Sequence, residues 1–265
     1  MKKITSKDGT QIAVDKSGKG PAVVLVGGAF NTRTFGPNVD IAPALADRFT
    51  VYTYDRRGRG DSTDTQPWAV EREVEDLEAV IKEAGGSAFV FGISSGAALV
   101  LEATGHGIGI EKVALYEAPF IVDDSRAALS ADYLARLKQA VAEDRRADAI
   151  KLFMTEGVGL PGFFVALMRL MPAWKKLKAV AHTVIYDAET IAEHTTGKPL
   201  PAGKWSAATA PTLVMAGGKS PAWMRNGMQA LADNLPNAEF RILKGQMHVV
   251  KAKAIAPVLA DFFGG

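Results

Sequence analysis

Gly92-Ile93-Ser94-Ser95-Gly96 matches the pattern G-x-S-x-G. In this pattern a sharp, strained turn lifts the serine side chain above the edge of a sheet, and glycines are needed because a Cβ atom beside the turn would clash. The helix that begins after the turn offers backbone N–H groups and its positive dipole end to a developing anion. The segment therefore predicts a nucleophile at Ser94, against the simpler interpretation of a serine that only caps a helix.

The sequence on either side gives the motif the setting that it requires. An apolar run at 88–91 is typical of a buried strand, and an alanine-rich run at 97–104 is typical of a helix. Strand, turn and helix in this order form a nucleophile elbow.

Similar short apolar runs recur along the chain. They lie at 22–26, 50–54, 112–116, 211–216 and 239–243. Helical patterns lie between most of them, for example at 70–83 and 222–234, and residues 2–15 are typical of an opening β-hairpin. Strands that alternate with helices predict an α/β fold with a parallel sheet and helices on both faces.

One interval interrupts this alternation. Between Glu117 and Pro211 no buried-strand pattern occurs, and the chain shows helical patterns instead. They lie at 125–143, 146–156, 161–171 and 173–185. We therefore expect an α/β core made of residues 1–120 and 207–265, with residues 121–206 inserted as a helical lid.

The composition limits the kinds of chemistry and of binding partner that the protein can have. The chain has 265 residues, no cysteine and a formal net charge of +2, so disulfides and thiol nucleophiles are excluded and nothing favours nucleic acid or an anionic membrane. The basic start is not followed by an apolar run, and no apolar stretch is long enough to span a bilayer. We expect a cytoplasmic protein that acts on a small-molecule substrate without nucleic acid or membrane; the sequence leaves the oligomeric state open.

A serine hydroxyl is a weak nucleophile and needs a base. Among the four histidines, His248 lies just after the last strand-like run, where a loop reaches the carboxyl edge of the sheet. His182 and His194 fall in the lid and are expected at the surface, and His106 is expected at the end of a helix. His248 is therefore the expected base.

The chain resembles the α/β-hydrolase superfamily over nearly its whole length. Besides the serine motif, YDRRGRGDS at 54–62 is similar to the family's turn after its fourth strand, GQMH at 245–248 to its histidine loop, and GGAF at 27–30 to its oxyanion loop. The resemblance implies an eight-stranded, mostly parallel sheet with an inserted helical cap. It also implies that backbone N–H groups of Ala29 and Ser95 form the oxyanion hole, although Gly27 replaces the usual histidine.

The acid of a catalytic triad is missing from its usual place. Most family members carry Asp after the strand that here ends at Gly217, but no carboxylate follows until Asp233. Glu117 ends the strand after the nucleophile strand, a position that holds the acid in some members, including haloalkane dehalogenases. We expect Glu117 to be the acid, with Asp123 and Asp124 as alternatives.

No other motif in the sequence indicates a binding site. The arginines Arg56, Arg57 and Arg59 are expected in a solvated turn, because no wider basic patch accompanies them. No phosphate-binding loop, complete dinucleotide fingerprint or metal-spaced histidine pair occurs. The mechanism implied needs no cofactor and no metal.

The expected function is hydrolysis of an ester, thioester or lactone by a serine hydrolase. Phe30, Met247 and Trp223 flank the predicted site and are candidates for an apolar substrate pocket, although core packing explains each of them equally well. Two alternatives stay open: a cofactor-free perhydrolase (haloperoxidase-like) or C–C hydrolase on the same fold, and a non-catalytic binding protein, prompted by the missing Asp and by Gly27.

Overall fold

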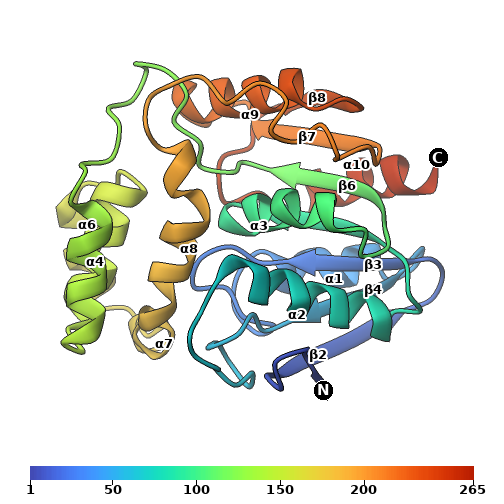
Figure 1. The fold of residues 1–265 in the computed structure, drawn as a ribbon, viewed down its shortest axis with the longest axis horizontal. Helices are drawn as coiled ribbons and strands as arrows, with labels where there is room; N and C mark the ends of the chain where they lie inside the picture. The colour runs from blue at the N-terminus through green and yellow to red at the C-terminus, as the bar shows by residue number, and fades with distance from the viewer.

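A single sheet of eight strands forms the centre of the computed structural model, which describes residues 1–265 (Figure 1). The strands are β1 (Lys2–Thr5), β2 (Gln11–Gly18), β3 (Ala22–Val26), β4 (Thr50–Tyr54), β5 (Ala88–Ile93), β6 (Ile110–Tyr116), β7 (Thr212–Gly217) and β8 (Ala238–Leu243). Their order across the sheet is β1-β2-β4-β3-β5-β6-β7-β8, and only β2 pairs in the antiparallel sense, with β1 and β4. The predicted hairpin and the mostly parallel sheet are confirmed.

Helices cover both faces of the sheet because successive strand residues point to opposite sides. In β3, Val24 and Val26 pack in one core cluster, and Val23 and Leu25 pack in the other. One face carries α2 (Val70–Glu83), α3 (Ser95–Ala103) and α9 (Ala222–Asn234), and the other carries α1 (Asn38–Leu45) and α10 (Ala252–Gly264). The predicted helices on both faces are thus present.

Between β6 and β7 the chain forms helices and no strand. They are α4 (Tyr133–Ala142), α5 (Arg146–Leu152), α6 (Gly162–Met168), α7 (Ala173–Ala179) and α8 (Val184–Ile191). In Figure 1, α8 lies between the sheet and the α4–α6 group, and it contacts both α3 and α4. This helix packs the insert against the core.

The helix limits expected within the insert are partly wrong. The helix expected at 125–143 begins only at Tyr133. The one expected at 173–185 is two helices, because the backbone leaves the α-helical region at Val180 and makes a short 3-10 turn at Ala181–Thr183. Periodicity alone did not reveal this break, since apolar residues continue through it.

Not every apolar side chain of the insert is packed. Phe163, Phe164 and Met171 are each about half exposed or more, so core packing does not explain them. No helix in the structure combines the length and the apolar character needed to cross a lipid bilayer.

Candidate active site

Ser94 occupies the bend between β5 and α3. Its backbone has φ 59° and ψ −132°, a conformation that non-glycine residues rarely adopt. The amide of Ser94 donates to the carbonyl of Tyr116 at the end of the neighbouring strand, at 2.8 Å, which holds the bend in place. The predicted strand–turn–helix arrangement around Ser94 is present.

Close backbone contacts explain the glycines around the bend. A Cβ atom on Gly92 would lie 2.6 Å from the carbonyl oxygen of Gly96, and one on Gly96 would lie 2.6 Å from that of Gly27. A Cβ atom on Gly28 would lie 2.7 Å from the Cβ atom of Ser94 itself. Any larger residue would therefore push the serine or the 27–30 loop out of place.

Glu117 and His248 form a hydrogen bond, with 2.9 Å between Oε2 and Nδ1. A carboxylate can only accept, so Nδ1 is the donor of this bond, and in the neutral form of an imidazole this tautomer leaves Nε2 as an acceptor. The second carboxylate oxygen accepts the amide of Gly217, at 2.6 Å. Glu117 is completely buried, whereas the side chain of His248 is 35% exposed, so the imidazole can meet a substrate.

The register of the sheet places this pair beside the serine. Ile93 of β5 pairs with Tyr116 of β6, so Ser94 and Glu117 are the next residues on adjacent strands, which run about 4.8 Å apart. Ser94 and His248 make no direct hydrogen bond. In serine hydrolases the hydrogen bond between nucleophile and base is often long without substrate and shortens when it binds.

Two hydrogen bonds hold the loop that carries His248. The Tyr116 hydroxyl donates to the carbonyl of Met247 at 2.7 Å, and the amide of Lys219 donates to that of Gln246 at 2.9 Å. Burial raises the pKa of Tyr116 above its ordinary value, so this hydroxyl remains a donor. His248 is thereby held at the edge of β6 and β7.

The alternative acids are engaged elsewhere. Asp123 accepts hydrogen bonds from Ser125 and Asn226, which lower the pKa of its carboxyl. Asp124 is exposed, and neither aspartate bonds to His248. Of the three carboxylates considered from the sequence, only Glu117 contacts the imidazole.

Backbone strain is concentrated at this place. Four non-glycine residues have positive φ angles, and three of them are Phe30 (62°), Ser94 (59°) and Glu117 (49°). Strained residues of this kind cluster at functional sites, where the surrounding structure holds them. The three segments that carry the predicted nucleophile, acid and oxyanion loop are thus all strained.

The amides predicted to bind an oxyanion are free. Neither Ala29 nor Ser95 donates its backbone N–H to another protein group. Ser95 is the first residue of α3, where helix geometry leaves the amide without an acceptor. The arrangement offers two donors beside Ser94.

The prediction of a solvated arginine turn is wrong. Arg56, Arg57 and Arg59 are at most 2% exposed. Arg57 pairs with Asp76 and Asp8, away from Ser94, while the other two pair with carboxylates of α2 and α8. The residues near the turn did not indicate this burial, because the partners lie 17 to 131 positions away in the sequence.

Asp187 of α8 is the residue that the sequence analysis missed. It is completely buried and binds Arg56 and Arg59 at 2.8 Å each, and it accepts the hydroxyl of Ser95 at 2.7 Å. Burial alone raises the pKa of Asp187, but the two arginines outweigh it, so the pKa lies below its ordinary value. A lone carboxylate between apolar neighbours at 184–188 was the available signal.

The remaining histidines lie outside this group. His194, expected at the surface, is buried and packs against Phe120 and Trp205, with ring centroids 4.6 and 5.2 Å away. His182 is half-buried, and burial lowers its pKa despite the nearby Asp64. The exposed His106 ends a short 3-10 turn, as expected.

The predicted pocket residues lie in different surroundings. Phe30 packs edge-on against Phe153 of the insert, with ring centroids 5.5 Å apart. Trp223 lies under the guanidinium of Arg126, 4.4 Å from its ring centroid, and Met247 is mostly exposed. Their role as one substrate pocket remains a prediction.

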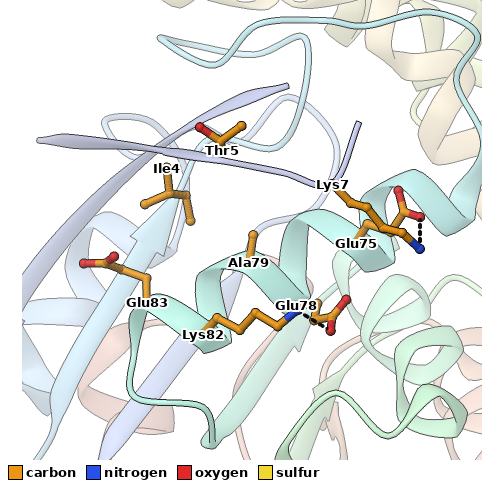
Figure 2. Close-up of a pocket in the computed structure, with 8 residues that line it drawn as sticks. All are labelled: Ile4, Thr5, Lys7, Glu75, Glu78, Ala79, Lys82 and Glu83. Atoms are coloured by element: carbon orange, nitrogen blue, oxygen red, sulfur yellow. Dashed lines mark ion pairs between the residues drawn. The ribbon is translucent and has the colours of Figure 1, made fainter. Parts of the chain in front are cut away.

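A polar groove elsewhere on the surface contains none of the predicted site residues. It lies between β1 and α2, and two of its eight lining residues are hydrophobic. Figure 2 shows ion pairs between charged side chains of the groove, Lys7 with Glu75 and Lys82 with Glu78. No group of three His, Asp or Glu side chains in the structure could hold a metal ion.

Comparison with known proteins now identifies the family. The model of the alpha/beta hydrolase family matches residues 23–255. This chain belongs to the alpha/beta hydrolase family. The match includes Ser94, Glu117, His248 and the whole helical insert, and it confirms the resemblance drawn from the motifs.

Solved structures superpose over nearly the whole chain. An alpha/beta hydrolase from Sphaerobacter thermophilus DSM 20745 is 52% identical, with a TM-score of 0.92 over 99% of this chain and 100% of that one. The enol-lactonase from Burkholderia xenovorans LB400 is 19% identical, with a TM-score of 0.71 over 100% of both chains, which shows the shared fold.

A curated relative matches a shorter segment. The probable oxidoreductase EphD of Mycobacterium tuberculosis (strain ATCC 25618 / H37Rv) is 38% identical over 85 residues. This segment covers 30% of this chain and 14% of that protein's length.

Proposed function

We propose that this hydrolase cleaves a carboxylic ester, thioester or lactone through a covalent acyl-enzyme on Ser94. The observation that carries the proposal is the hydrogen bond between buried Glu117 and His248, at the sheet edge where Ser94 sits on its strained bend. A nucleophile, a base and a group that orients the base are the three parts that acyl transfer requires.

In the first half of the reaction, Ser94 Oγ attacks the substrate carbonyl while Nε2 of His248 takes its proton. The carbonyl oxygen becomes an oxyanion, which the amides of Ala29 and Ser95 bind, each contributing about 3 kcal/mol. The bond to the leaving group then breaks, and His248 returns the proton to that group. In the second half, His248 takes a proton from water, which attacks the acyl carbon. The bond between this carbon and Ser94 Oγ then breaks, His248 returns the proton to Oγ, and the carboxylic acid is released.

Glu117 keeps the imidazole in the correct tautomer and stabilises the imidazolium that forms during each half. Its burial and its bond to Gly217 favour this role, because the carboxylate cannot rotate away. The role also supports an enzyme over a non-catalytic scaffold, since the acid missing after β7 has a replacement.

We further propose that residues 121–206 act as a cap that limits the site to small-molecule substrates. The contact between Phe30 and Phe153 joins the oxyanion loop to this segment, which supports the assignment. No step requires a cofactor.

Turnover of p-nitrophenyl esters and of simple lactones tests the proposal. We expect Ser94→Ala and His248→Ala to lower kcat/KM by about 10⁴-fold or more, while the exposed Ser87→Ala keeps the wild-type rate. Undiminished turnover by Ser94→Ala would remove this serine from the mechanism. A second arm supplies acetate and hydrogen peroxide; Ser94-dependent peracid formation without ester turnover would favour the perhydrolase.

A further inference from the structure

A buried network of charges reaches both arms of the proposed oxyanion hole. Arg59 donates to the carbonyl of Gly28 at 2.6 Å, to the hydroxyl of Thr183 at 3.0 Å and to Asp187 at 2.8 Å. Asp187 in turn accepts the hydroxyl of Ser95. Thr183 and Asp187 both belong to the helical insert, so this network joins the insert to the catalytic loops.

The bond from Arg59 helps to fix the direction of an amide: the carbonyl of Gly28 accepts from Arg59 at 2.6 Å and also from the amide of Asn31 at 3.2 Å. Gly28 and Ala29 share a planar trans peptide, in which the carbonyl and the N–H point in opposite directions. Holding the Gly28 oxygen on the Arg59 side therefore aims the Ala29 N–H away from Arg59. Because Gly28 lies against Ser94, the amide that follows it is placed next to the nucleophile.

The second arm is held by the same carboxylate. Ser95 carries the other proposed donor on its backbone, and its side chain is anchored by Asp187 at 2.7 Å. Both donors thus take their orientation from one residue of α8.

The network carries as many positive as negative charges. This balance favours a role in orienting the two amides over a direct electrostatic effect on the oxyanion. Two buried cations, Arg56 and Arg59, face two buried anions, Glu73 and Asp187. Such a balanced group projects little net field to the site. Its contribution is the geometry of the bonds that it makes.

We propose that Arg59 is a positioning residue for the oxyanion hole and that Asp187, carried by the insert, holds it in place. This inference rests on the proposed function. It predicts that the insert must be docked on the core for the oxyanion hole to be formed.

Arg59→Met tests the inference, with Arg57→Met as its matched control. Both arginines lie in the same turn, both are completely buried, and both pair with carboxylates, but Arg57 bonds to Asp76, Asp8 and the carbonyl of Arg72 rather than to the site. The measurements are thermal unfolding, kcat and KM for an ester, and the inhibition constant of a trifluoromethyl ketone that mimics the tetrahedral intermediate.

We expect Arg59→Met to lower kcat about 10²- to 10³-fold and to weaken the ketone similarly, with KM changed less than about 3-fold, since one oxyanion donor is lost. Arg57→Met should change stability but neither kcat nor ketone binding. Arg59→Lys, which can still reach Gly28, should recover part of kcat. If Arg59→Met does not fold, Thr183→Val gives the same readouts with a smaller fall in kcat.

The outcomes separate the two proposals. Ser94-dependent turnover with wild-type kcat and ketone binding in the Arg59 variant, or in Thr183→Val if that variant replaces it, overturns the positioning role alone. An equal loss of kcat in the Arg57 and Arg59 variants overturns it too, because general destabilisation would then suffice. Wild-type protein without Ser94-dependent turnover overturns the proposed function, and the inference with it.

Discussion

Glu117 and Asp187 are both completely buried carboxylates close to the same bend, and their partners set them apart. Glu117 binds an imidazole and the amide of Gly217, whereas Asp187 binds two guanidinium groups and a hydroxyl. An imidazole can gain and lose a proton near neutral pH, but a guanidinium cannot. Equal burial can therefore serve proton transfer in one place and a fixed geometry in the other.

Among the variants of these two carboxylates and their surroundings, Glu117→Gln should have the largest effect on kcat. Glutamine keeps the size of the side chain but can donate a hydrogen bond to Nδ1, which stabilises the wrong tautomer of His248. We expect kcat to fall about 10⁴-fold, with the unfolding temperature close to that of the wild type. Steady-state kinetics and a thermal melt check both expectations.

Asp123→Asn is the control for that variant, because Asp123 bonds to Ser125 and Asn226 and not to the imidazole. It should keep kcat within about 2-fold. A large loss in Asp123→Asn together with an active Glu117→Gln would transfer the acid role to the alternative.

Asp187→Asn should affect stability most. It leaves Arg56 and Arg59 buried with only Glu73 as a charged partner, which costs about 3–5 kcal/mol in the free energy of unfolding measured with urea. The double variant Asp187→Leu with Arg59→Met should recover much of this loss, because an apolar pair avoids the uncompensated charge. A loss below about 1 kcal/mol in Asp187→Asn would contradict the network.

The dependence of the unfolding free energy on pH, on the acid side, should also show the contribution of Asp187. The pKa of Asp187 is below its ordinary value of 3.8 in the folded protein, so its stabilisation is present above that value and disappears as the pH falls through the folded pKa. Wild-type stability should therefore decrease with falling pH more steeply than that of Asp187→Asn below about pH 5. Equal slopes of unfolding free energy against pH would contradict this.

The smallest effect is expected for Lys82→Ala, at the groove in Figure 2. Lys82 pairs with Glu78 at 2.7 Å, but its side chain is 69% exposed. Exposed helix pairs of this kind contribute about 0.3–0.5 kcal/mol. Activity should be unchanged and salt should abolish the stability difference; a fall in kcat would show that the groove takes part in function.

The parts of this molecule that follow local rules were predictable from the sequence. The alternating apolar runs predicted the strands and the helices on both faces of the sheet. The motif at 92–96 predicted the bend, because close backbone contacts there leave room only for glycine. The hydrogen bond between Glu117 and His248 agrees with the expected pairing. Chain order and strand ends were enough to suggest it.

Long-range partners were not predictable in the same way. The sequence favoured a solvated arginine turn because the carboxylate that pairs with Arg56 and Arg59 lies in a helix far along the chain. His194 packs against Phe120, which is also far away in the sequence, and against Trp205. Only the folded chain shows that charge in one element is neutralised by another.

Covalent labelling of the nucleophile by a phosphonylating reagent is the most direct test of the mechanism. Wild-type protein is mixed with a fluorophosphonate, and the adduct is followed by intact-mass spectrometry and located by peptide mapping. We expect one equivalent on Ser94, none in Ser94→Ala, and labelling at least about 100-fold slower in Glu117→Gln, since the base is then misdirected. Labelling at another residue, or an unchanged rate in Glu117→Gln, would contradict it.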